Sequence, residues 1–284
     1  MKIDAFKTKY AAELGIAKQD LLALVRPCVP FDAIKRSSGN EPGLFESRLG
    51  GNPAWPKEHP LPRDSNGDHM VFVFQFNLAD FKGLDGFPNS GLLQLFLGND
   101  TNERGITGIP EYRKPGDYPL HNGDAFQLVY HDKTDGLVET AYPLPEAEFK
   151  VYTPEIAAGR FGILAGEVCQ MIPPIDEMHG TDIFNRFASL PEVGDDHWEL
   201  FGFLSETLWR EQLDIGLHLG GYANPLQLDQ RSFFKEYRKY DRCLISFAEM
   251  EGLDLPDMVF SVLISDQDLK ERRFDDVVLI ADTD

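Results

Sequence analysis

A glycine pair with a strand pattern after it occurs twice in this sequence, and it limits the possible folds more than any other feature. The first copy is Leu49-Gly50-Gly51-Asn52-Pro53-Ala54-Trp55-Pro56, and the second is Leu219-Gly220-Gly221-Tyr222-Ala223-Asn224-Pro225. Glycine has no Cβ, so each pair permits positive φ or a close approach of another segment. The prolines fix φ and hold the following chain extended. Each copy therefore indicates a stiff turn. Trp55 adds a rigid aromatic that either packs there or faces a ligand.

Alternating hydrophobic residues after each glycine pair predict β-strands. Phe72, Phe74 and Phe76 fall on one face of a strand over residues 71–78, and Leu92, Gln94 and Phe96 share one face of a strand over 92–97. Similar runs predict further strands over residues 29–36, 125–131, 146–152, 242–248, 259–264 and 274–281.

Helical patterns complete the expected secondary structure. Apolar residues recur at helical spacing over residues 4–25, 181–190 and 196–214, and Thr153-Pro154 is typical of a helix start. Residues 231–242 are charged and partly helical. We therefore predict an α+β fold, with a mainly antiparallel sheet on which the helices pack.

The two glycine pairs begin an internal repeat. Residues 49–51 align with 219–221, residues 72–76 with 243–247, and residues 92–97 with 259–264. This predicts a pseudo-duplication of a Gly-Gly turn plus a two-strand unit, with half-repeats at about 44–97 and 215–282 in a single domain over 1–284. If approximate symmetry relates the halves, a crevice between them is the default ligand site.

Composition excludes several classes of partner. The 284 residues include 47 acidic and 27 basic side chains, for a net charge of −20. Such a surface repels nucleic-acid phosphates, and it permits a basic protein partner or a cationic ligand, or serves solubility. No run approaches the roughly 18 apolar residues of a membrane span. No secretory signal is visible. We expect a cytoplasmic protein, and the sequence leaves the oligomeric state open.

No known catalytic or metal-binding motif appears. Walker, GxGxxG, GxSxG and HExxH patterns are missing. Asp64, Asn66 and Asp68 alternate as in a calcium loop, but His69 occupies the glycine place and the final glutamate is missing, so we predict a β-turn at Asn66-Gly67. The three cysteines are Cys28, Cys169 and Cys243. They form no CxxC, and we interpret them as packing residues. We expect no metal and no cofactor.

Candidate ligand-binding residues lie beside the glycine pairs. Buried glutamine amides need hydrogen-bond partners, so Gln75 and Gln94 either bind backbone or reach into a pocket. His218 either makes one backbone hydrogen bond or acts as an acid–base group or metal ligand. Arg48 either pairs with an internal carboxylate or binds an anion. The full candidate set is Arg48, Gly50, Gly51, Trp55, Gln75, Gln94, His218, Gly220, Gly221 and Gln227.

Five segments carry a resemblance to a known family. Residues 46–56, 74–78, 87–96, 218–227 and 257–284 resemble the YwqG-like family, a bacterial family also described as domain of unknown function 1963. The family often has Trp-Gly-Asp-Gly where this chain has Leu255-Pro256-Asp257-Met258. The resemblance implies an α+β domain with no established reaction, whose members are candidates for immunity or regulatory roles.

Two functional hypotheses follow. The first is a non-enzymatic binding protein, of immunity or regulatory type, with an acidic surface that steers a basic partner. The alternative is an enzyme or small-molecule binder that uses a crevice between the halves, lined by Arg48, Trp55, Gln75, His218 and Gln227.

Overall fold

The computed structural model describes residues 24–99, 120–141, 154–171, 216–223, 229, 231, 234–248, 250 and 258–283. The strand expected over 146–152 and the helices expected over 181–190 and 196–214 lie outside the described residues. So do residues 4–23 of the expected N-terminal helix.

The described elements are mainly strands. They are β1 (Arg26–Lys35), β2 (Arg48–Leu49), β3 (Ala54–Pro56), β4 (Val71–Asn77), β5 (Leu92–Leu97), β6 (Leu120–His121), β7 (Phe126–His131), β8 (Leu137–Glu139), β9 (Phe161–Ala165), β10 (Cys169–Met171), β11 (His218–Gly220), β12 (Arg242–Ala248), β13 (Met258–Ile264) and β14 (Val277–Thr283). The helical elements are α3 (Pro154–Ala157), the 3-10 helix η5 (Lys235–Lys239) and α6 (Asp266–Glu271).

The predicted α+β class with packed helices is wrong. The regular secondary structure of the described residues is almost entirely antiparallel sheet, and their helical elements are one or two turns long. Pro27 and Pro30, which directly follow the helix predicted over residues 4–25, lie inside strand β1. The segment after residue 160, for which no strand was predicted, forms β9 and β10. Pairing with β1 fixes these strands, and a local pattern does not reveal such long-range pairing.

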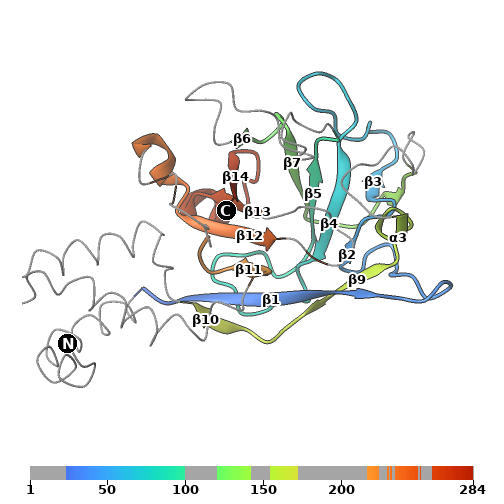
Figure 1. The fold of residues 1–284 in the computed structure, drawn as a ribbon, viewed down its shortest axis with the longest axis horizontal. Coiled ribbons are helices and arrows are strands. Elements are labelled where there is room, and N and C mark those ends of the chain that lie inside the picture. The colour runs from blue at the N-terminus through green and yellow to red at the C-terminus, as the bar shows by residue number, and fades with distance from the viewer. Residues whose placement is uncertain are drawn as a thin grey trace, which may run out of the picture.

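The main sheet has 12 strands and nearly closes on itself. Its order is β6-β14-β13-β12-β11-β1-β9-β2-β4-β5-β7, and β10 pairs with β1 off this path (Figure 1). The two ends, β6 and β7, are consecutive in the chain. Asn122 joins them, because it forms a bridge with Phe126 and accepts at its side-chain oxygen from the Leu128 N–H, at 2.8 Å. The result resembles a barrel in which few strand edges stay open.

Two four-strand units supply eight of the twelve strands of this sheet. The first unit is β2, β4, β5 and β7, and the second unit is β11, β12, β13 and β14. Their registers agree: Gln75 pairs with Gln94 in the first unit, and Ser246 pairs with Ser261 in the second. A bulge interrupts the first pair between Phe72 and Phe74, and the second between Cys243 and Ile245. Each unit thus repeats the pairing and the bulge of the other.

Strands β9 and β1 join the two units at the centre of the sheet. β2 pairs with β9, and β11 pairs with β1, so β9 and β1 occupy equivalent places. β9 and β1 then pair with each other, with Asp32 opposite Leu164. In Figure 1, β1 runs beneath both units, with β12 to β14 on one side and β4, β5 and β7 on the other.

The inner face of the sheet is a packed apolar core. Phe74 of β4 and Phe247 of β12 meet edge to face, with ring centroids 5.1 Å apart. Phe247 also stacks on Phe260 at 5.0 Å, and Phe31 of β1 contacts Phe76 at 5.1 Å. These contacts join the units and β1 into one hydrophobic cluster. The interior is therefore filled by side chains, as in small barrels.

Each unit also carries a smaller apolar cluster on its outer face. Trp55, Leu61 and Phe96 belong to the cluster on the first unit, beside the two-stranded β3–β8 ribbon. Tyr240 and Leu263 belong to the cluster on the second unit. These clusters bury the outer face next to each glycine pair, and the candidate polar residues lie there.

Candidate functional site

The glycine pairs hold tight turns that no other residue would accommodate. Gly50 and Gly51 have φ values of +67° and +74°, and Gly220 and Gly221 have +78° and +66°. A Cβ on Gly50 would collide with the carbonyl of Ile156. The same atom on Gly221 would lie 2.9 Å from the sulfur of Met171. Both the positive φ and the close neighbours therefore require glycine.

Gln75 and Gln94 form a buried amide relay beside the first glycine pair. Gln75 Nε2 donates to the carbonyl oxygens of Leu44 and Glu46, at 2.8 and 2.9 Å. Gln94 Nε2 donates to Gln75 Oε1 at 2.8 Å and to the carbonyl of Ala54 at 2.9 Å. The two amide nitrogens thus bind backbone carbonyls on both sides of the turn, and both side chains are fully buried.

Arg48 lies beside these two glutamines, because it is the register partner of Gln75 in the β2–β4 pair. Its Nη2 donates to the carbonyl of Asn52, and its guanidinium lies 5.8 Å from the ring centroid of Phe72. Burial lowers the pKa of Arg48, and the charge of Glu139 opposes that shift. Its Nε is buried without a hydrogen-bond partner.

Trp55 packs against neighbouring rings on the outer face of the first unit. Its Nε1 donates to the carbonyl of Pro60 at 3.0 Å, and its ring meets the rings of Phe96 and His131 edge to face, each at 5.4 Å. His131 was not among the sequence candidates. Its Nε2 lies 3.2 Å from Gln94 Oε1, and because an amide oxygen only accepts, Nε2 carries the proton. Burial lowers the pKa of His131.

The second unit carries an equivalent row of buried polar residues. His218 lies opposite Ser246, and Ser246 lies opposite Ser261. His218 Nδ1 lies 3.1 Å from the carbonyl of Gly220, so Nδ1 donates and Nε2 presents a lone pair. Burial lowers the pKa of His218 to about 4, against the opposing effect of that hydrogen bond, so the ring is neutral at pH 7.

Two atoms of this second row have no hydrogen-bond partner in the part of the chain that the structure describes. They are His218 Nε2 and Ser246 Oγ, both fully buried. A buried polar atom without a partner is costly and calls for an explanation. Sequence reasoning missed Ser246 and Ser261. The alignment of the two repeats could have identified both serines, because it places Ser246 at the position of Gln75 and Ser261 at the position of Gln94.

The structure does not bring all the candidate residues together. Arg48, Trp55, Gln75 and Gln94 meet on the outer face of the first unit, whereas His218 lies on β11 in the second. β9 and β1 separate β2 from β11, which puts three strand spacings of about 4.8 Å between them. Gln227 lies outside the described residues. The inner faces that the units turn toward each other are apolar.

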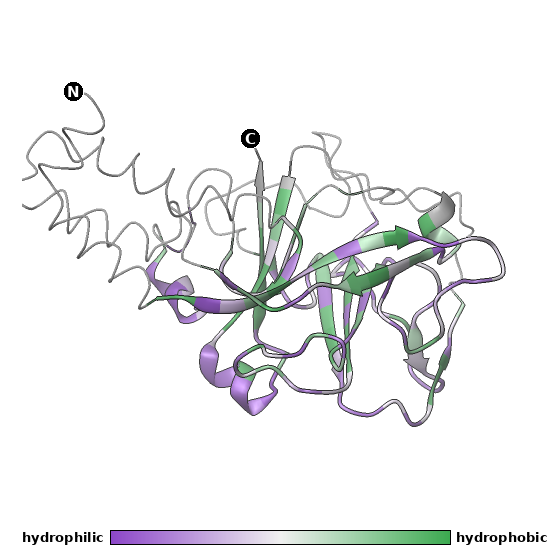
Figure 2. Cartoon of the chain, turned by 90° about the horizontal axis from the view of Figure 1, so that it is seen from below, coloured by the Kyte–Doolittle hydropathy of each residue, from purple (hydrophilic) through white to green (hydrophobic). Residues whose placement is uncertain are grey.

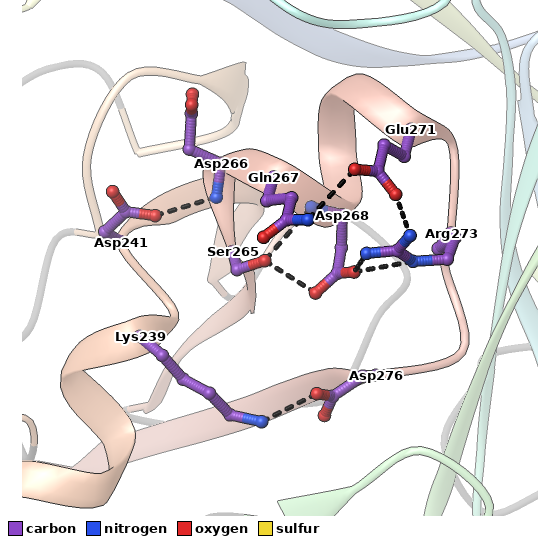
Figure 3. A network of polar contacts seen from close by, with 9 residues as sticks. All are labelled: Lys239, Asp241, Ser265, Asp266, Gln267, Asp268, Glu271, Arg273 and Asp276. Atoms are coloured by element: carbon purple, nitrogen blue, oxygen red, sulfur yellow. Dashed lines mark hydrogen bonds and ion pairs between the residues drawn. The ribbon is translucent and has the colours of Figure 1, made fainter.

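A charged cluster surrounds α6, and its members are paired with one another (Figure 3). Ser265 caps the helix by accepting from the N–H of Asp268, and Arg273 binds the Asp268 carboxylate at 2.6 Å. Those hydrogen bonds, from Ser265 first and then Arg273, lower the pKa of Asp268. Lys239 pairs with Asp276 at 2.6 Å. The cluster therefore stabilises the α6 region and presents no converging set of unpaired carboxylates.

Within the described parts of the chain, no three His, Cys, Asp or Glu side chains group as metal ligands would. None of the helices described there is long and apolar enough to span a membrane.

Comparison with known proteins gives a family and no curated relative. No curated protein matches the sequence. A family model described as a domain of unknown function (DUF1963) matches residues 47–283, which include both glycine pairs and both units. The chain therefore belongs to the DUF1963 family.

Proposed function

We propose that this chain is a non-enzymatic binding protein, cytoplasmic and of immunity or regulatory type, whose partner is a basic protein. The observation that carries the proposal is the amide relay. Gln75 and Gln94 were the clearest polar candidates, and their amide nitrogens hold backbone carbonyls around the first glycine pair. These hydrogen bonds stabilise the fold. We therefore place the binding function on the surface of the protein.

The charge of the surface favours a basic partner. A net charge of −20 steers cationic proteins into encounter and repels acidic ones. Such steering is screened by salt over about 10 Å at 0.1 M ionic strength. Binding by this route should therefore weaken as salt is added.

The outer face of the β1–β9 pair is the surface that best fits such a partner. Phe31 and Ala33 point to the core, so Asp32 and Ile34 point outward. Ile34 is 45% exposed, and Leu164, directly opposite Asp32, is 57% exposed. Figure 2 views the molecule from this side, with the β1–β9 pair in front. Exposed aliphatic side chains beside a carboxylate suit a partner with an apolar centre and a basic rim.

Capture from cell lysate followed by binding measurements with the captured protein tests this proposal. Leu164→Glu should weaken binding roughly ten-fold or more, because a buried leucine contact is worth about 1.5–3 kcal/mol. Asp32→Lys should weaken it several-fold and flatten its dependence on salt. Asp275→Lys is the matched control, since it makes the same change of charge just before β14, which lies near one end of the sheet and away from the central β1–β9 pair.

Three results together would support the proposal. The captured protein must be basic, its binding must weaken with salt, and the β1–β9 variants must weaken it while Asp275→Lys does not. A partner whose binding ignores salt or ignores these variants argues against the proposal. So does a lysate that yields no salt-sensitive partner.

A second candidate function rests on His218 and Ser246. His218 Nε2 and the Ser246 hydroxyl lie on adjacent strands, and neither has a hydrogen-bond partner among the described residues. This favours a small-molecule binder or an enzyme in which a ligand engages both groups in the second unit. Because both side chains are fully buried, a ligand or probe reaches them only when the fold opens locally. A fluorophosphonate probe should then label Ser246 slowly, and Ser246→Ala and His218→Gln should abolish the labelling. A protein that is not labelled at Ser246 is not a serine-nucleophile enzyme.

A further inference from the structure

Cys28 and Cys169 face each other across two antiparallel strands. They are direct partners in the β1–β10 register, although 141 positions separate them in the chain. Their sulfur atoms lie 3.1 Å apart. All three cysteines of the chain are reduced thiols in the structure.

The backbone at this pair already fits a disulfide. Residues directly opposite in an antiparallel pair have Cα atoms about 4.5–5.5 Å apart. Disulfides bridge Cα separations of about 4.4–6.8 Å. The sulfurs need to approach by about 1 Å to reach the bonded separation of about 2.0 Å, and side-chain rotation can supply that movement.

The two thiols differ in how reagents can reach them. Cys28 is fully buried, and burial first, then the hydrogen bond with Cys169, raises the pKa of its thiol. Cys169 is only partly buried. An external disulfide can therefore reach Cys169 and cannot reach Cys28, which fixes the order in which the two would react.

We propose that Cys28 and Cys169 form a redox-sensitive modification site that reacts with small disulfides of the glutathione type. The Cys169 thiolate attacks one sulfur of the small disulfide, which breaks that bond and releases the first thiolate. The Cys28 sulfur then attacks Cys169 Sγ in the mixed disulfide, and its proton passes to the departing second thiolate. The protein loses two hydrogens as the small disulfide is reduced to two thiols.

The crosslink would act on the second glycine pair. Cys28 is the register partner of both Cys169 and Gly220, so β10 and β11 meet at this one residue of β1. A Cβ on Gly221 would lie 3.0 Å from the Cβ of Cys28. The N–H of Tyr222 donates to the sulfur of Met171, at the end of β10. Oxidation would therefore tie β10 covalently to the place where the second unit begins.

Thiol counting on the full chain in glutathione buffers of increasing oxidised fraction tests this site. After alkylation in denaturant and peptide mapping, the oxidised protein should have lost two of its three alkylatable thiols. The missing pair should appear as one crosslinked peptide joining Cys28 and Cys169. Cys243 is the internal control and should remain alkylatable.

Two variants separate the roles of the thiols. Cys243→Ser should form the same crosslink as the unmodified chain, whereas Cys28→Ser should stop at a mixed disulfide on Cys169. Three outcomes with the unmodified chain overturn the proposal: all thiols persist in oxidising buffer, glutathione stays on Cys169, or the crosslink involves Cys243. The peptide map of the unmodified chain decides the matter even where a variant fails to fold.

Discussion

Gln94 donates a hydrogen bond to the side-chain oxygen of Gln75, its direct partner across the β4–β5 pair, at 2.8 Å. Both side chains are fully buried. Gln75 also donates hydrogen bonds to the carbonyls of Leu44 and Glu46, and Gln94 donates one to the carbonyl of Ala54. Two glutamines thus fasten the segments that enter and leave the first glycine turn onto the sheet.

Replacing Gln94 by leucine should destabilise the fold by roughly 1–3 kcal/mol. The substitution keeps a side chain of similar size and leaves Gln75 Oε1 and the Ala54 carbonyl without their shared donor. Urea unfolding followed by intrinsic fluorescence measures the change. Gln127→Leu is the control, because Gln127 lies half-buried on β7, and it should change stability by less than about 0.5 kcal/mol. Equal losses from the two variants would contradict the role of the relay.

Gly50→Ala should be among the most damaging alanine substitutions in the chain. Gly50 has a φ of +67°, and an added Cβ would overlap the carbonyl of Ile156, so strain and collision act together. We expect a loss of about 3 kcal/mol or more. Gly39 has a similar φ of +85° but nothing within 4 Å of an added Cβ. Gly39→Ala should therefore lower the free energy of unfolding only by the strain of a positive φ, about 1 kcal/mol.

Thermal unfolding of the two glycine variants separates collision from strain. If Gly39→Ala and Gly50→Ala lower the midpoint equally, then the contact with Ile156 contributes nothing. The same comparison at Gly221, beside Met171, would show whether the second pair is equally constrained.

The long strands were predictable because their patterns persist over several residues. The strands predicted over 92–97, 242–248 and 259–264 are confirmed at β5, β12 and β13, where apolar residues line the core face. The two-residue strand β2 could not be predicted, because pairing with β4 and β9 defines it. Helix α6 was missed although Ser265, with Asp268 three residues later, is a capping signal.

The candidate site was predictable only in part, for a similar reason. A buried glutamine needs partners wherever it lies, so the sequence indicates that Gln75 and Gln94 matter. It does not indicate which carbonyls they reach, since those belong to loops placed by tertiary packing. His131 reaches Gln94 from the next strand, and only the β5–β7 register brings it there.

His218 should make stability depend on pH in weakly acidic solution. Burial depresses its pKa in the folded protein to about 4, below the ordinary value of 6.5, so the unfolded chain binds more protons between these values. The contribution of His218 to the free energy of unfolding is fully present above pH 6.5, and it is lost as the pH falls toward 4. The full contribution is on the order of 3 kcal/mol.

Urea unfolding at several pH values, with His218→Gln beside the unmodified protein, checks this expectation. The variant should lose the part of the pH dependence that lies between pH 6.5 and 4, whatever its stability at pH 7. His59→Gln makes the same substitution at an exposed histidine and is the control for the change of residue type. A His218→Gln protein with the original pH slope would show that the imidazole titrates normally in the fold.

Asn122 should control how firmly the sheet closes. Its Oδ1 accepts from the N–H of Leu128 on β7, and its Nδ2 lies 3.3 Å from the carbonyl of Phe274, just before β14. Its own N–H donates to the carbonyl of Val277 at 3.2 Å. Removing the side chain in Asn122→Ala deletes the links to β7 and to residue 274 together, which should cost roughly 1–3 kcal/mol.

Hydrogen exchange distinguishes loss of closure from a general loss of stability. In Asn122→Ala, amides of β6, β7 and β14 should exchange faster than those of β1 and β9, because the last two strands lie at the centre of the sheet. Asn66→Ala is the matched control, since Asn66 lies at an exposed turn and should leave exchange unchanged. Uniform acceleration over all strands would mean that Asn122 stabilises the fold without governing its closure. The ends of the sheet would then be held by the β6–β7 turn and the packed core alone.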